Sequence, residues 1–164
     1  MPIKGIVTRP LPDWFYRYGA SGSGLAATDF VNTYYVGLYN NATDGSELWV
    51  YGLSAWCQTT NPTIATYAAY QPADTFVANG LPVVLGGASV FGQIHTGMDN
   101  NWALETPGWS FTKQGNGKAI IFAPYPLAII RPGWQWNVLE QAASNGLAVS
   151  FYWIALPGTA VSSG

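Results

Sequence analysis

The stretch of residues 131–156 constrains the fold more than any other part of this sequence. Within it, Leu147, Val149, Phe151 and Trp153 share one face of a period-2 strand. Residues 134–139 form a second extended run, and the Asn-Gly pair at 145–146 is typical of tight hairpin turns because both residues tolerate positive φ. Pro132-Gly133 fits the central positions of a type II turn. We therefore expect a long aromatic hairpin, with Phe151 and Trp153 pointing inward.

Extended runs separated by turn residues recur along the rest of the chain. We expect strands at residues 30–39, 47–57, 63–70, 88–96, 109–113 and 118–122, with shorter ones near 81–85 and 127–130. Residues 30–39 and 47–57 should form one hairpin, and 109–113 and 118–122 another. Gly92 marks a bulge or a close approach, and no run has the periodicity and length of a confident helix.

Strands at this spacing, about eight to ten in number, predict an all-β fold, an antiparallel β-sandwich or barrel. A jelly roll is the first choice. A Greek-key sandwich of another strand order is the alternative, because sequence does not fix the order of strands.

The N-terminal part of the chain differs from the rest and divides the sequence into three parts. Residues 1–29 are expected to be an irregular arm interrupted by prolines, with residues 19–24 as a flexible Gly/Ser connector. Residues 30–157 form the sandwich domain, and residues 158–164 a tail. The arm contains a dense aromatic cluster that must bury either on its own core or on a neighbouring subunit: Trp14, Phe15, Tyr16, Arg17 and Tyr18.

Low charge and high aromatic content are the chief compositional signals. Charged residues are 9% of the chain and aromatic residues 15%, whereas average domains carry about 25% charged residues. Two explanations stand: an uncharged polar surface, or a surface covered by partner subunits or a ligand, since interfaces enrich Tyr and Trp and deplete Lys and Glu. Six scattered Lys and Arg residues and a net charge of −2 argue against nucleic acid or a membrane surface as partner.

Targeting and redox signals are few. No signal-peptide pattern and no apolar run of about 18–20 residues is visible, so synthesis in a cytoplasm is expected. Cys57 is the only cysteine, which excludes an intrachain disulfide and predicts a buried, inert thiol.

Catalytic and metal motifs do not emerge from the sequence. His95 is the one histidine, and a metal site would need Asp99 and Glu105, a weak pattern. The sequence lacks a nucleophile elbow and a phosphate loop, and no carboxylate pair stands out. We therefore expect no enzyme, no cofactor and no metal. Trp102 and Trp109, in or beside a loop, could stack on sugar rings, or they could be core or interface residues.

Three segments carry a family resemblance. LYNNATDGSELWVYGLS (residues 38–54), PLAIIRPGWQWN (126–137) and GLAVSFYWIAL (146–156) resemble small β-sandwich virion proteins of tailed bacteriophages. In these, an early L-x-N-x-x-x-x-G-x-x-L-x-V hairpin and a late P-G-x-x-x-x-V … L-x-V-S-F-x-W hairpin recur. The matching parts cover somewhat under half of the chain. An acidic pair often follows the last Trp in that family, and here residues 154–157 read IALP.

The resemblance implies a structural role without catalytic residues. Such proteins decorate or cement the capsid exterior, often as homotrimers, and the partner would be the major capsid protein. The aromatic arm at residues 14–18 would then contact the shell or a neighbouring subunit. The alternative is a glycan-binding module or a receptor-binding tip of a fibre or tail, using Trp102 and Trp109.

Overall fold

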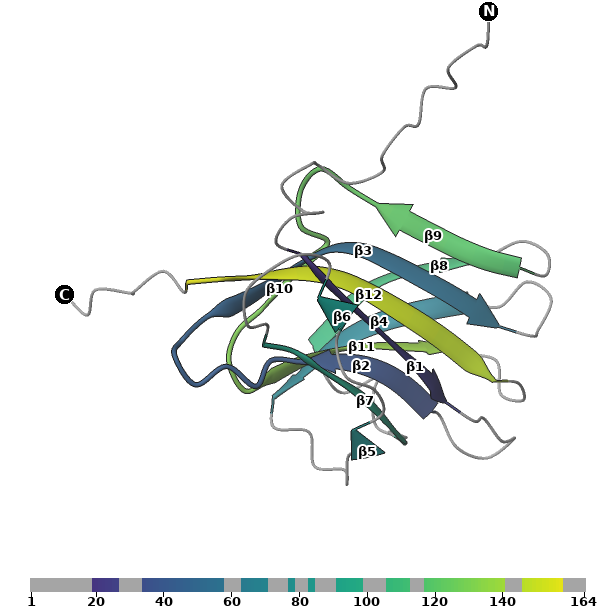
Figure 1. Ribbon diagram of the computed structural model, residues 1–164. Coiled ribbons are helices and arrows are strands. Elements are labelled where there is room, and N and C mark those ends of the chain that lie inside the picture. Colours follow the sequence, from purple (N-terminus) through teal and green to yellow (C-terminus); the bar gives the residue numbers. More distant parts are fainter. Residues whose placement is uncertain are drawn as a thin grey trace, which may run out of the picture.

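The chain folds into twelve described β-strands arranged in two layers (Figure 1). The computed structural model describes residues 19–26, 34–57, 63–70, 77–78, 83–84, 91–98, 106–112, 117–140 and 146–157. Every strand pairing among them is antiparallel. The strands are β1 (Ala20–Ala26), β2 (Tyr34–Tyr39), β3 (Glu47–Cys57), β4 (Thr63–Tyr70), β5 (Val77–Ala78), β6 (Val83–Val84), β7 (Gln93–Met98), β8 (Thr106–Thr112), β9 (Gly117–Phe122), β10 (Ala128–Ile130), β11 (Trp134–Glu140) and β12 (Leu147–Leu156).

The strand order is that of a jelly roll. Sheet A has the order β10-β3-β12-β1-β6, with β9 also paired to β3, and sheet B has the order β5-β7-β2-β11-β4-β8. The pairs nest from the outside of the chain inward: β1 with β12, β2 with β11, β3 with β9, and β4 with β8. One long antiparallel ribbon rolled into two layers produces this nesting. The predicted β-sandwich and its jelly-roll topology are therefore confirmed.

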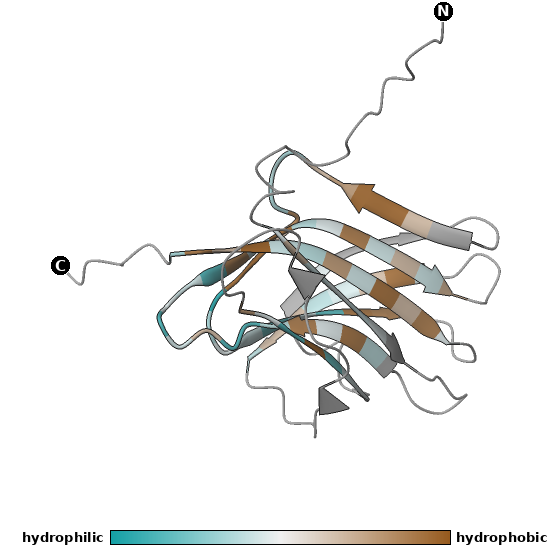
Figure 2. Cartoon of the chain, viewed as in Figure 1, coloured by the Kyte–Doolittle hydropathy of each residue, from teal (hydrophilic) through white to brown (hydrophobic). Residues whose placement is uncertain are grey.

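The core lies between the two sheets and is built by alternation along each strand. Phe151 and Trp153 of β12 are fully buried, as predicted. Phe151 meets Trp136 of β11 across the core, with ring centroids 5.9 Å apart. Figure 2 shows the same alternation as brown and pale segments along β3 and β12. Burying side chains of this size stabilises the fold by about 1.5–3 kcal/mol each.

The three expected hairpins are wrong, although their strands exist. β2 and β3, β8 and β9, and β11 and β12 each fall in opposite sheets. A jelly roll passes the chain from one sheet to the other at these connections, so consecutive strands face each other across the core. The sequence pattern is the same for a hairpin within one sheet and for a connection between two sheets. In either arrangement each strand presents one apolar face and is followed by turn residues.

The expected Gly/Ser connector is also wrong. Residues 20–26 form β1, which pairs with β12 over seven positions from Ala20↔Trp153 to Ala26↔Leu147. A Cβ at Gly22 would lie 2.8 Å from Ile94, and a Cβ at Gly24 would lie 2.8 Å from both Ile94 and Val36. Glycine is therefore needed here so that β1 can approach the opposite sheet.

Several local predictions are confirmed. β3 and β4 have the predicted bounds, and Cys57 is buried as predicted. Gly133 has φ +78°, and Trp134 N–H donates to the Arg131 carbonyl at 3.0 Å, which is a type II turn. Gly92 is a close-approach site, since a Cβ there would lie 2.8 Å from the Trp153 ring.

Candidate functional site

Most of the site residues predicted from sequence lie outside the described part of the chain. This holds for residues 14–18 of the arm, for Trp102, and for Asp99 and Glu105. Trp109 lies in β8, but its side chain is not among those described. A site must therefore be built from other residues.

His95 of β7 takes part in a buried polar cluster on the outer face of sheet B. Its Nδ1 lies 3.1 Å from Gln135 Oε1, and its ring stacks on Tyr39 with centroids 5.1 Å apart. The Gln135 amide in turn donates to Asn137 Oδ1. Burial lowers the pKa of His95, and the hydrogen bond that its ring donates to Gln135 Oε1 opposes this. Among the described residues no group of three or more His, Cys, Asp or Glu side chains could hold a metal.

Asn40 fastens two connections together at one end of the sandwich. Its side-chain amide donates to the carbonyls of Ser46 and Ile130, both at 2.8 Å. Its backbone N–H donates to Trp134 O, and its carbonyl accepts from Gly133 N–H, both at 3.0 Å. Asn40 is 1% exposed, so these bonds are shielded from water. The β2–β3 and β10–β11 connections are thereby held in fixed positions.

A pocket of about 580 Å³ opens beside this end. It lies between the start of β3, the short edge strand β10, and strands β4 and β11 of the other sheet. Its lining includes three tryptophans, two charged residues and several aliphatic residues: Glu47, Trp49, Ala68, Ala128, Ile129, Ile130, Arg131, Trp134, Gln135 and Trp136. The volume lies within the range of about 300–1,000 Å³ typical of small-molecule sites.

Polar side chains of the pocket are held in place. Trp49 Nε1 donates to Glu47 Oε2 at 3.3 Å, while Glu47 Oε1 lies 3.9 Å from Arg131 Nε. The Glu47 side chain is 15% exposed and that of Arg131 is 76% exposed. Gln135 also lines the pocket, but its amide contacts His95 on the opposite face of sheet B. The charged groups of the pocket are those of Glu47 and Arg131.

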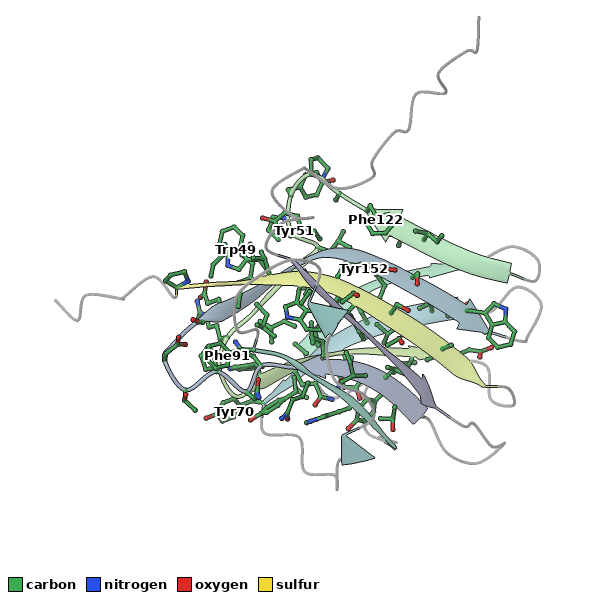
Figure 3. The ribbon with its side chains drawn as sticks, viewed as in Figure 1. Trp49, Tyr51, Tyr70, Phe91, Phe122 and Tyr152 are labelled. Atoms are coloured by element: carbon green, nitrogen blue, oxygen red, sulfur yellow. The ribbon has the colours of Figure 1, made fainter. Side chains whose placement is uncertain are left out.

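A second feature is an apolar cluster on the outer face of sheet A, which we call the sheet A outer face. Its members come from β3, β9 and β12: Trp49, Tyr51, Phe122, Tyr152, Ile154 and Leu156. Phe122 and Tyr152 meet edge to face with centroids 5.2 Å apart. Figure 3 labels four of these side chains along the upper side of the view, apart from Tyr70. Burial among these rings raises the pKa of the Tyr51 phenol.

More apolar side chains extend the sheet A outer face toward its edge. Ile120 of β9 is 57% exposed, and Ile129 of β10 and Trp56 of β3 are also exposed. The outer face of an antiparallel sheet is ordinarily polar where it meets water. An aromatic and aliphatic outer face is the kind of surface that marks a contact with another protein.

Sequence reasoning missed both features, although one signal was present. Glu47 and Trp49 are two residues apart on a strand that was correctly bounded, so they must share a face. Their approach to Trp134 and Trp136 depends on the order of strands, which the sequence alone left open.

Comparisons with known proteins add no assignment. No protein-family model matches the chain, and a search of curated proteins finds no match. Within the part of the chain that the structure describes, no helix is long and apolar enough to cross a membrane.

Proposed function

We propose that this chain is a structural protein of a virus particle that decorates the capsid shell and associates with itself through the sheet A outer face, as a homotrimer. The observation that carries the proposal is the apolar character of that face. Trp49, Tyr152 and Leu156 remain partly exposed in the single chain. Three copies arranged with this face toward a common axis would bury it at roughly 25 cal/mol for each Å² removed from water.

Composition and sequence resemblance support the same role. A chain with 9% charged and 15% aromatic residues has the composition expected of a surface covered by partners. The segments that resemble phage virion β-sandwich proteins cover β12 and parts of β3 and β11, which form the centre of the jelly roll. A capsid protein works through many repeated contacts, so it needs no catalytic centre.

Introducing an acidic residue on the sheet A outer face tests self-association. We expect light scattering after size exclusion to give three times the 17.6 kDa chain mass for the wild type. Tyr152→Glu should give monomers, because the buried charge would be unpaired in the assembly. Thr43→Glu, at an exposed turn position, serves as the matched control and should remain trimeric. A monomeric wild type that also fails to rebind capsids stripped of this protein would overturn the proposal.

Removing the arm tests whether it contacts the shell. The truncation should end at residue 18, because β1 begins at Ala20 and pairs on both sides in sheet A, with β12 and with β6. We expect the truncated protein to unfold at nearly the same temperature while binding stripped capsids more weakly. Equal capsid binding would remove Trp14, Phe15, Tyr16, Arg17 and Tyr18 from the proposed contact.

A further inference from the structure

We infer that the pocket between β3, β10, β4 and β11 binds a neutral pyranose sugar. The inference rests on the pocket's own geometry and not on the proposed capsid role, although Trp49 belongs to both the pocket and the sheet A outer face. It assigns sugar binding to residues other than Trp102 and Trp109.

Aromatic surface is the first requirement, and the pocket supplies it from two sheets. Trp49 comes from sheet A, and Trp134 and Trp136 come from sheet B. Trp134 also lies against Tyr70, with ring centroids 5.3 Å apart. Tyr70 is 55% exposed, so this pair extends the aromatic surface beyond Trp134. A pyranose presents one apolar face of C–H groups, and that face packs on an aromatic ring.

Hydrogen-bonding groups that match hydroxyls are the second requirement. A carboxylate accepts at two oxygens with about four lone-pair sites, and the Trp49 N–H occupies one of them. Glu47 therefore keeps acceptor capacity toward adjacent hydroxyls. Arg131 is a donor only and is 76% exposed at the rim. One acceptor and one donor side by side complement a diol.

Charge balance selects a neutral ligand. Glu47 and Arg131 carry opposite charges 3.9 Å apart, and the other residues that line the pocket are uncharged. An anionic ligand would meet the Glu47 carboxylate, and a purely apolar chain would exclude water from that carboxylate without offering it a further hydrogen-bond donor. A neutral polyol avoids both costs.

The site is preorganised, which lowers the entropic cost of binding. The bonds of Asn40 to Ile130 and Trp134 fix both strands that flank the Arg131 turn. The Trp49–Glu47 hydrogen bond fixes the carboxylate beside its indole. Trp136 is 5% exposed and wedged against Phe151, so one pocket wall is rigid.

Tryptophan fluorescence titrations of the full chain test the inference, with maltotriose, cellotriose and tri-N-acetylchitotriose as probes. We expect at least one probe to give a saturable change below about 10 mM. Trp134→Phe and Glu47→Gln should each weaken that binding at least tenfold, while the circular dichroism spectrum stays unchanged. Tyr125→Phe, at an exposed aromatic residue that does not line the pocket, is the control and should bind as the wild type does.

Two results would overturn the inference. One is the absence of saturable change with all three sugars in a folded protein. The other is tighter binding of sodium dodecanoate or of an apolar peptide than of any sugar, which would identify the pocket as a hydrophobic groove. Glu47→Gln keeps the size of the side chain, and Trp134→Phe keeps an aromatic ring at a partly exposed position, so loss of folding should not mask the outcome.

Discussion

The outer faces of the two sheets are both rich in aromatic residues, yet they meet their surroundings differently. On sheet B, Tyr35, Tyr67 and Leu139 are each at most 1% exposed within the single chain. On sheet A, the rings of Trp49 and Tyr152 remain partly exposed. The outer face of sheet B is thus closed by its own chain, and that of sheet A is partly open.

Polar groups follow the same division. Sheet B buries the His95, Gln135 and Asn137 side chains in a hydrogen-bonded row beside its apolar cluster. Such a buried polar row has specific geometric demands, because each group left without a partner costs about 1–3 kcal/mol. The sheet A outer face has packed aromatic and aliphatic side chains where sheet B has this polar row. The two outer faces therefore differ in composition: that of sheet B combines polar and apolar side chains, and that of sheet A is mainly apolar.

The largest expected effect is at Gly37 on the closed face. A Cβ there would lie 2.6 Å from Gln135 Nε2 and still closer to Asn137 Oδ1. Both amides are buried and bonded to each other, so neither can move aside without losing a partner. We expect Gly37→Ala to lower the free energy of unfolding by about 3 kcal/mol, from overpacking together with a broken hydrogen bond. Urea denaturation at fixed protein concentration measures it.

A matched substitution on the open face should cost less. Gly52 of β3 lies opposite Phe122 and Tyr152, and a Cβ there would lie 2.5 Å from Phe122 Cδ1 and 3.1 Å from Tyr152 Cδ2. Phe122 is only partly buried at the end of β9, so its ring can turn toward solvent. We expect Gly52→Ala to cost about 1 kcal/mol. An equal cost for the two glycines would contradict the distinction between a closed and an open face.

Sequence alone predicted the strands well but not how they assemble. The bounds of β3 and the inward side of β12 follow from period-2 alternation, and the Pro132-Gly133 turn follows from positive φ at glycine. These are local properties that neighbouring residues determine. Period-2 alternation and turn residues are the same whether β11 and β12 pair side by side or face each other across a core. The prediction of a hairpin was therefore wrong.

β1 is a strand that its composition led us to predict as a linker. A run of Gly and Ser resembles a linker when it is viewed without its neighbours. In the fold, Gly22 and Gly24 face Ile94 and Val36 of the opposite sheet at contact distance. Only the tertiary structure reveals that small size, not flexibility, is what this segment contributes.

The candidate pocket depended on the same missing information. Period-2 alternation puts Trp134 and Trp136 on one strand face, and Glu47 and Trp49 on a face of another strand. Their convergence requires that β10 and β3 lie over β11 and β4, which is a consequence of the jelly-roll order.

The smallest expected effect concerns the pH dependence of the closed face. Burial lowers the pKa of His95 in the folded state, whereas an unfolded histidine titrates near about 6.5. The unfolded chain therefore binds the proton more readily, so the contribution of His95 to stability is fully present above about pH 6.5. It is lost progressively as the pH falls through 6.5 toward the lower pKa of the folded state.

Thermal unfolding midpoints recorded between about pH 7.5 and pH 5 measure this effect in the wild type and in His95→Gln. We expect the wild type to lose stability over that interval more steeply than the variant, because His95 is the one histidine of the sequence. The carboxylates are common to both proteins, so their contribution cancels in the comparison. Identical slopes would show that His95 can take up a proton without disturbing Gln135 and Tyr39, and the outer face of sheet B would then be less tightly closed than its buried amides indicate.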